Sequence, residues 1–530
     1  MAEPIRFEYR YETRASIARA FRAMSDTDAF NKVAKGGMRF SHERAPDGTE
    51  RAMGAVSKLG MTVRWEEEPF SFRAPHWFKT VRAFENGPAA KMTARAQFAA
   101  LPNGNTMIAY QLEVIPRVSI FRPIILFDLK RTLEKDLRTA IEAVVTHLEQ
   151  GGDLDPDASY AGPPPALKTA QAARLNALAD RLQASALRDR LIAFIRAAPE
   201  RDQKSMSPIG LAQAWVAPLE NVAMLCVAAA HVGLLGVRID LLCPACLVPK
   251  AAVDASGRLP EVHCESCNIR LDASYPEGLA VHFFPSPEVR EIDIRMECLG
   301  SPAKTPQVVA QDQVAPRGEV NLATTLEPGT YQLRTLPLMG PPALLDVRDG
   351  EQNKDATFTV HGSIQPQLVR IRTEPASITV KNPSDRKVFV VLERLVPARR
   401  VLSLGRMLIE YPQLKDLLPA VGFISTMAAY KGVACSIRPA DASEVPKIAA
   451  SLPNARLTYT SDWVVLANYA DIGKLERDLG NLDKTQLLVG VAQGTLSEST
   501  LGGRKVPMGP AVDEAYAAMC GTTFGVVARR

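Results

Sequence analysis

Four cysteines arranged as two Cys-x-x-Cys pairs are the residues whose types and spacing best support a specific chemistry. The pairs are Cys243 with Cys246 and Cys264 with Cys267. A structural zinc ion takes four ligands at the corners of a tetrahedron, and each pair can supply two thiolates from one tight turn. The spacing matches the two-pair zinc pattern. Because four thiolates leave no open position for water or substrate, we expect a structural zinc ribbon over residues 241–279 that contributes folding energy.

The sequence offers little else for catalysis. It contains no G-x-S-x-G nucleophile elbow and no Walker loop, and its seven histidines include no His-x-x-x-His pair. His263 could compete as a zinc ligand, but its neighbour Cys264 has the pair spacing. The Gly-rich stretch GGRKVPMGP falls in an expected hairpin rather than between a strand and a helix, so we do not expect phosphate binding there.

Length and composition bound the class of protein. The 530 residues exceed what one core organises, so about three to five domains are expected. Apolar residues make up 46% and charged residues 23%, the balance of a soluble globular protein. A net charge of +5 is too small to predict nucleic-acid or membrane binding. The polar start lacks the core of a signal peptide, and residues 221–237 predict a buried helix, so we expect a cytoplasmic protein without a membrane span.

Residues 1–150 alternate between strand and helix patterns in a definite order. The strand-like IRFEYRYE precedes a helical segment, several strand-like runs and a long helix with apolar spacing from Leu133 to Leu148. This order and the SDTDAFNKVAKGG segment resemble the START-like, or SRPBCC, superfamily. The resemblance implies a helix-grip fold whose sheet wraps the last helix around a cavity for a lipid or other small hydrophobic ligand. The aromatic residues fit a plain core, the alternative being a ligand cavity: Trp65, Phe72, Trp77 and Phe78.

The middle of the chain divides into a linker, a helical unit and a strand-rich region. Gly, Pro and Asp dominate residues 151–165, which predicts a linker. Residues 166–240 show helical stripes and then a helix–helix–strand order typical of a winged helix. A DNA-reading helix needs Arg, Lys, Asn or Gln toward the bases, whereas the second helix here is mostly apolar, so we favour a packing module. Residues 280–395 are short β-branched runs bounded by turn residues, which predicts a β-sandwich.

Residues 166–395 also resemble one known arrangement, on their Cys pattern and on the segments FFPSPEVR and SPAKTPQVVAQ. They are similar to an uncharacterised bacterial domain found in front of class III adenylate/guanylate cyclase domains, often behind a START-like domain. The resemblance implies a regulatory, non-catalytic role. We expect the zinc ribbon to pin the helical unit to the β-sandwich, as a rigid connector that separates the two ends of the chain. The resemblance also implies a cyclase-like domain over residues 396–530.

That cyclase-like domain lacks most residues that the chemistry requires. A class III cyclase holds two metal ions with two carboxylates, and the ions clamp the triphosphate and activate the ribose hydroxyl. The resemblance places Asp462 at the second metal aspartate, the one position that is retained. The other positions have lost their chemistry: Arg438 stands at the first metal aspartate, Thr458 at the purine-reading lysine, and Asp513 and Ala517 at the transition-state asparagine and arginine. We therefore expect a pseudocyclase.

The sequence thus predicts a multidomain α+β protein. It joins a START-like helix-grip domain, a winged-helix-like unit with a zinc ribbon, a β-sandwich and a degenerate ferredoxin-like cyclase domain. We expect a non-enzymatic sensor or scaffold with no catalytic residue and with zinc as its cofactor. Its expected partners are a small hydrophobic ligand and, at the C-terminal domain, a protein or a second copy. Two alternatives stay open: a divergent nucleotide cyclase using Asp441 and Asp462 as metal ligands, and a DNA-binding regulator.

Overall fold

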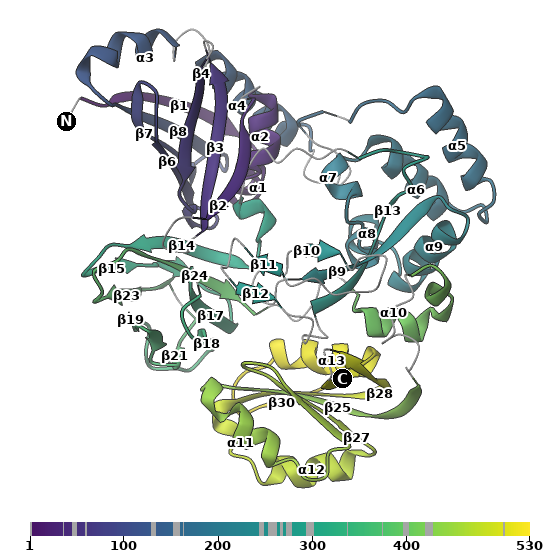
Figure 1. The fold of residues 1–530 in the computed structure, drawn as a ribbon. Coiled ribbons are helices and arrows are strands. Elements are labelled where there is room, and N and C mark those ends of the chain that lie inside the picture. The colour runs from purple at the N-terminus through teal and green to yellow at the C-terminus, as the bar shows by residue number, and fades with distance from the viewer. Residues whose placement is uncertain are drawn as a thin grey trace.

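Figure 1 shows the computed structural model of the chain, in which helices and strands form several packed domains. The structure describes residues 3–34, 37–44, 50–58, 61–128, 134–151, 160–162, 164–242, 249–252, 262–264, 269–271, 278–292, 301–336, 338–373, 375–395, 402–418, 428–501 and 504–530. In the view of Figure 1 the N-terminal domain lies above the strands of the middle region. The helical unit lies to their right, and the C-terminal domain lies below both.

The N-terminal domain is a curved antiparallel sheet packed against a long helix. Its elements are β1 (Ile5–Thr13), α1 (Ile17–Met24), α2 (Thr27–Val33), β2 (Arg39–Arg44), β3 (Glu50–Lys58), β4 (Met61–Glu67), β5 (Ser71–Arg73), β6 (Trp77–Phe84), β7 (Ala89–Ala100), β8 (Thr106–Pro116), η1 (Ser119–Phe121), α3 (Arg122–Asp128) and α4 (Glu134–Glu149). The strand order is β1-β8-β7-β6-β4-β3-β2. The predicted first strand and closing helix are confirmed, with Leu137, Ile141, Val144 and Leu148 of α4 buried; Leu133 lies outside the described residues.

Local capping fixes where the two short helices of this domain begin. The Ser16 hydroxyl accepts a hydrogen bond from the Arg19 amide at the start of α1, and the Asp26 carboxylate accepts one from the Ala29 amide at the start of α2. Such caps satisfy amide groups that have no partner inside the helix. Both helices then bury apolar side chains, including Phe21 and Phe30, in the core that α4 shares with the sheet.

Strand β5 joins this domain to the middle of the chain. It pairs with β6 on one side and with β14 (Val308–Val314) on the other, so the two domains share one 13-stranded sheet. The Arg73 guanidinium at the end of β5 lies 2.9 Å from the Asp312 carboxylate, and both side chains are largely buried. Burial lowers the pKa of Arg73, and the Asp312 charge opposes that shift. Val308 and Val391 from the middle region pack in the same hydrophobic core as Phe72 of β5.

The helical unit holds a second core. Its elements are α5 (Thr169–Ala179), α6 (Ala186–Ala197), α7 (Glu200–Gln203), α8 (Pro208–Trp215), α9 (Leu219–His231), β9 (Leu235–Leu242), β10 (Pro249–Ala252) and β13 (Leu279–Pro285), with sheet order β10-β9-β13. β13 pairs with β9 over its whole length. The predicted sandwich boundary at residue 280 therefore cuts through a strand of the helical unit, because a strand belongs to the sheet that satisfies its backbone groups.

Residues after 301 form two sheets around a third core. One sheet has the order β14-β24-β17-β18-β21 and the other β15-β23-β19-β20. The bounds are β15 (Gly318–Asn321), β16 (Thr324–Thr325), β17 (Gly329–Leu336), β18 (Ala343–Val347), β19 (Ala356–His361), β20 (Ser363–Gln365), β21 (Leu368–Ile371), β22 (Pro375–Ala376), β23 (Ile378–Asn382) and β24 (Val388–Arg394). Leu333 and Leu345 from the first sheet meet Phe358 and Val380 from the second in one buried cluster. This is the face-to-face packing of a two-sheet sandwich.

The C-terminal domain contains a mixed six-stranded β-sheet with helices, and a short helix precedes it. Its elements are α10 (Leu404–Glu410), η6 (Pro412–Asp416), β25 (Ala429–Pro439), η7 (Ala442–Glu444), α11 (Val445–Ala450), β26 (Leu457–Thr460), β27 (Val465–Tyr469), α12 (Ile472–Gly480), η8 (Lys484–Gln486), β28 (Leu487–Leu501), β29 (Arg504–Met508), α13 (Pro510–Cys520) and β30 (Val527–Arg529). The chain order β25-α11-β26-β27-α12-β28 gives the spatial order β26-β27-β25-β28. The cyclase resemblance itself stays a prediction.

Two sequence expectations about this architecture can be compared with the structure. Over the described ranges, no helix combines the length and the apolar character that crossing a membrane requires. The expectation that a rigid, zinc-clipped connector separates the two ends of the chain stays a prediction; the structure shows that both end domains contact the sandwich. The N-terminal domain contacts it through β5. The C-terminal domain contacts it where Arg438 of β25 donates a hydrogen bond to the Gln332 side chain of β17.

Gly54 of β3 offers a direct test of packing in the N-terminal domain. It lies opposite Trp65 of β4, and a Cβ atom added at Gly54 would lie 2.2 Å from the Trp65 ring. Since the ring is buried and cannot give way cheaply, we expect Gly54→Ala to lower the free energy of unfolding by about 1–3 kcal/mol. Urea unfolding followed by tryptophan fluorescence measures this change. Gly480→Ala, where an added Cβ meets nothing within 4 Å, is the control; equal stability of the two variants would contradict the packing.

Candidate functional site

A large cavity lies inside the N-terminal domain, between the sheet and the helices. Its volume is about 820 Å³. Strand alternation explains which side chains reach it, because every second residue of a strand points to the same face. The strand residues that line it are Val56 from β3, Met61, Val63, Trp65 and Glu67 from β4, Phe78, Thr80, Arg82 and Phe84 from β6, Ala89, Met92 and Ala94 from β7, and Tyr110, Leu112 and Val114 from β8. The sheet therefore presents one continuous wall to the cavity.

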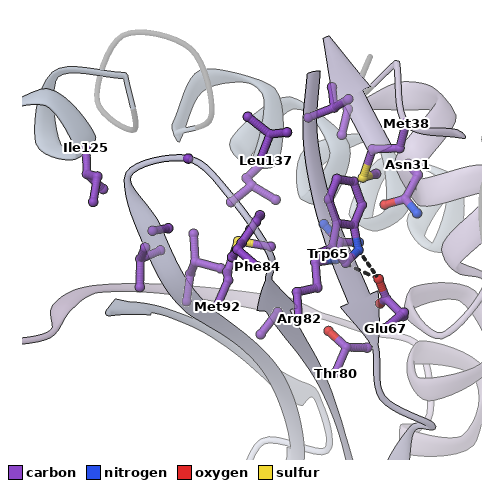
Figure 2. A pocket seen from close by; sticks show the side chains of 18 of the residues that line it. Asn31, Met38, Trp65, Glu67, Thr80, Arg82, Phe84, Met92, Ile125 and Leu137 are labelled. Carbon is purple, nitrogen blue, oxygen red and sulfur yellow. Dashed lines mark hydrogen bonds and ion pairs between the residues drawn. The ribbon is translucent and has the colours of Figure 1, made fainter. Parts of the chain in front are cut away.

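Helices and turns supply the rest of the lining. Met24 comes from α1, Phe30 and Asn31 from α2, Ile124 and Ile125 from α3, and Leu137 from α4. Figure 2 shows Ile125 and Leu137 on the helical side and Trp65, Thr80 and Arg82 on the strands at the other side. The lining is mostly aliphatic and aromatic with a few polar groups, which is the usual composition of a small-molecule site.

The cavity opens between the start of β4 and α3. Met61 and Ile124 line it, yet they are 57% and 53% exposed, so each side chain has one part in the cavity and another in solvent. Deeper lining residues such as Trp65 and Phe78 are buried. An apolar molecule can thus enter past exposed apolar side chains and end among buried ones.

The deep wall carries one buried ion pair. Glu67 and Arg82 face each other across β4 and β6, and Arg82 Nε donates to Glu67 Oε2 at 3.0 Å. The indole Nε1 of Trp65 donates to the same Glu67 oxygen at 2.7 Å. The Arg82 guanidinium also lies 5.2 Å from the centre of the Trp65 ring. Figure 2 shows these contacts at one side of the cavity. They hold a charged pair in a fixed place inside a mostly apolar wall.

Tyr110 adds a hydroxyl group to the same wall. Its ring stacks on Phe30 with ring centres 5.8 Å apart. Burial raises the pKa of Tyr110 to about 12, and the nearby Arg82 charge opposes the shift. The phenol therefore stays protonated at neutral pH and can donate a hydrogen bond.

The predicted zinc ligands fall almost entirely outside the described residues. Cys243, Cys246 and Cys267 are not described, and for Cys264 only the backbone is described, at the end of β11 (Val262–Cys264). The strands on either side of the cysteine pairs are described. Leu242 pairs with Pro249 in the β9–β10 hairpin, and Cys264 pairs with Ile269 of β12 (Ile269–Leu271). In the sequence, Cys243 and Cys246 thus fall between β9 and β10, and Cys267 falls between β11 and β12; the zinc site stays a prediction.

The predicted cyclase positions lie in the C-terminal domain without forming a metal site. Arg438 ends β25 and is buried against Gln332. Asp462 is exposed in the turn between β26 and β27, and Thr458 lies on β26. Ile437 pairs with Val465, so Arg438 and that turn share one sheet edge. No cluster of three or more metal-binding side chains occurs in the parts of the chain that the structure describes.

The other cyclase positions take part in contacts within the chain. Asp513 of α13 accepts a hydrogen bond from the Ser403 hydroxyl at 2.7 Å, and Ser403 caps α10. Ala517 lies one turn further along α13 and is half-buried. Asp441 caps the short helix η7 by accepting from the Ser443 amide. Asp513 thus joins α13 to α10, and Asp441 caps η7, which are structural roles.

Sequence reasoning missed the polar side of the cavity. Trp65 and Phe78 were expected in a core or at a cavity, and both line the cavity. Glu67 and Arg82 were not singled out, although their strands alternate apolar and polar residues. The available signal was the segment WEEEPF, because Glu67 sits on the same face of β4 as the buried Trp65.

Comparisons with known proteins concern a share of the chain close to that of the N-terminal domain. A START superfamily protein from Mycobacterium smegmatis is 20% identical and covers 27% of this chain and 98% of its own, with a TM-score of 0.21. A protein from Thermus thermophilus is 15% identical and covers 27% and 99%, with a TM-score of 0.21. The Zhui aromatase/cyclase from Streptomyces is 10% identical and covers 28% and 99%, with a TM-score of 0.23.

None of the three bears on the zinc ribbon or the cyclase-like domain, which stay predictions. The chain matches no protein-family model and no curated protein.

Proposed function

We propose that this protein is a non-enzymatic sensor that binds a small, mainly apolar molecule in the cavity of its N-terminal domain. The observation that carries the proposal is the cavity of about 820 Å³, whose lining is largely apolar and whose wall belongs to a sheet that continues into the sandwich. A site with these dimensions can enclose a lipid-sized or polycyclic molecule. Filling it would bury apolar surface on both the ligand and the protein, which favours binding.

The sheet gives a bound molecule a route to the sandwich. Phe70 lines the cavity, and its carbonyl oxygen accepts a hydrogen bond from the Gln311 side chain of β14 at 2.6 Å. Phe72 pairs with Gln311 across the β5–β14 ladder. A ligand that moves the Phe70 ring would therefore act on the residue before β5. Because β5 pairs with β14, the movement would reach β14. Coupling between the cavity and the sandwich requires a structural element whose conformation responds to both.

A buried polar network continues the route to the C-terminal domain. Glu393 on β24 accepts hydrogen bonds from Gln332 and Arg334, and Gln332 in turn accepts one from Arg438 at 2.9 Å. All four side chains are buried. Since a buried polar group is costly to leave unpaired, a shift of β24 should be followed by β25. The C-terminal domain would then display the ligand state to a partner, which we propose is a protein or a second copy of this chain.

The zinc ribbon belongs to this proposal as a structural part. Four thiolates between Leu242 and Ile269 would close a zinc site that ties β9 and β10 to β11 and β12. Such a site supplies folding energy without chemistry. The cyclase-like domain is proposed to be inert, because Arg438 and Asp513 are occupied in contacts within the chain.

Ligand binding can be tested with N-phenyl-1-naphthylamine, a neutral apolar fluorescent dye. We expect the dye to bind the purified chain, and we expect Ala94→Trp to weaken binding by about tenfold or more, because the new ring would fill part of the cavity. Ala100→Trp is the matched control, since Ala100 is exposed on the same strand. Fluorescence titration gives the dissociation constants. Equal affinity of both variants would place the dye elsewhere.

Coupling can be tested by hydrogen exchange with and without the same dye. We expect slower amide exchange not only in β6 to β8 but also in β14 and β25, because a bound ligand restrains the shared sheet. Arg438→Met removes the hydrogen bond to Gln332, and should abolish the change in β25 while that in β14 persists. A dye effect confined to the N-terminal domain would contradict the sensor role and leave binding intact.

Catalytic inertness has a direct assay. The purified protein incubated with manganese and ATP or GTP should form no cyclic nucleotide, because the resemblance retains a carboxylate only at Asp462. Mass spectrometry of the reaction mixture checks this. Cyclic nucleotide that forms with the wild-type chain and disappears with Asp462→Ala would establish the divergent cyclase instead.

Metal content tests the zinc ribbon. We expect one zinc ion per chain, lost in Cys246→Ser and in Cys267→Ser together with a lower midpoint of thermal unfolding, because a structural zinc contributes folding energy. Elemental analysis and calorimetry measure both effects. His263→Asn should keep its zinc; loss of zinc in that variant would show that the histidine, and not four thiolates, completes the site.

A further inference from the structure

The polar side of the cavity has a definite charge balance. Glu67 and Arg82 form one ion pair, and both side chains are buried, with 5% and 16% of their surface exposed. Their opposite charges offset one another, so this pair adds no net charge to the deep wall. Glu85, Arg117 and Asp136 also line the cavity, and the Arg117 guanidinium donates to the carbonyl oxygens of Gly87 and Phe84. A charged ligand group placed beside the Glu67–Arg82 pair would lose its hydration next to two charges that already offset one another, and burying an ion without its own counter-charge costs on the order of several kcal/mol.

The same groups keep unused hydrogen-bonding capacity. Both described hydrogen bonds of the Glu67 carboxylate end on Oε2, and within the described ranges Oε1 accepts none. Arg82 uses its Nε, and its two terminal nitrogens have no hydrogen bond among the described residues. The Tyr110 hydroxyl likewise has none in the described part of the chain. A buried carboxylate oxygen thus stands ready to accept, while a guanidinium and a phenol stand ready to donate.

One small functional group fits both roles at once. A hydroxyl group has one O–H donor and two acceptor lone pairs. It can donate to Glu67 Oε1 and accept from Arg82 or from Tyr110, all of which line the cavity. A carboxylate can only accept and adds a negative charge beside Glu67. An ammonium group can only donate and adds a positive charge beside Arg82. A plain hydrocarbon gives no hydrogen bond to Glu67 Oε1, to the terminal nitrogens of Arg82 or to the Tyr110 hydroxyl.

We propose that the cavity selects a neutral, largely apolar molecule that ends in a hydroxyl group, an alcohol or a phenol, and that Glu67, Arg82 and Tyr110 hold that group. This inference rests on the proposed function, since it names the class of ligand for the same cavity. The apolar body of the ligand lies toward the helical side, against residues such as Leu137 and Ile125, and its hydroxyl lies at the strand side.

The test compares three probes that share one tail and differ in one group: 4-hexylphenol, hexylbenzene and 4-hexylbenzoate. Each displaces N-phenyl-1-naphthylamine from the full-length chain at pH 7, and the displacement curve gives its dissociation constant. We expect 4-hexylphenol to bind about tenfold more tightly than hexylbenzene, the value of one or two net hydrogen bonds. We expect 4-hexylbenzoate to bind no more tightly than hexylbenzene.

Tyr110→Phe separates recognition from packing. The variant keeps the ring that stacks on Phe30 and loses only the hydroxyl. It should reduce the preference for the phenol over hexylbenzene at least threefold and leave the affinity for hexylbenzene unchanged. Tyr9→Phe is the matched control, because Tyr9 lies directly opposite Tyr110 on β1 and is buried outside the cavity lining. That control should keep the full preference.

Each other result overturns something specific. Tightest binding of the benzoate, or equal binding of all three probes, overturns the hydroxyl inference and leaves the sensor proposal standing. Equal preference in Tyr110→Phe and Tyr9→Phe removes Tyr110 from the site. If the dye binds but no probe displaces it, the inference fails alone. If the dye itself does not bind the wild-type chain, ligand binding fails, and the inference fails with it.

Discussion

The three residues of β5 carry the constraint on which the rest of the architecture depends. A strand so short has few hydrogen bonds of its own, so it is held by neighbours on both sides, β6 and β14. Arg73 reinforces the join by reaching Asp312 and the Asn321 carbonyl from a buried position. Breaking one partner of such a pair would leave an uncompensated charge, which typically costs about 3–5 kcal/mol. The N-terminal domain and the sandwich are therefore one mechanical unit.

The pairing of β5 with β14 places the cavity next to a second domain. Phe70 lines the cavity, and Phe70 and Phe72 pack in one core with Val308 and Val391 of the sandwich. The same strand thus serves packing and, in our proposal, communication. The polar network around Glu393 extends this contact to the C-terminal domain, where Arg438 donates a hydrogen bond to Gln332 of the sandwich.

Much of the local structure could be predicted from the sequence, and the long-range pairing could not. Period-2 runs and helical stripes predict β1 and α4, because those patterns record which face is buried. No pattern announces that β5 pairs with β14, more than 230 residues away, because its three residues are too few to carry a period. The Glu67–Arg82 pair was missed for a similar reason: each residue looks like ordinary surface charge until the register places them opposite each other in a buried wall.

Native mass spectrometry of the full-length protein, purified without added ligand, tests the central claim most directly. The account predicts a fraction of molecules that carry an extra mass of lipid or polycyclic size. Gentle activation should release that mass as a neutral molecule, and the Ala94→Trp variant should lack it. A chain that is free of any apolar adduct in every preparation, and that gains a stoichiometric nucleotide adduct when manganese and nucleotide are added, would contradict the account and identify the C-terminal domain as the working site.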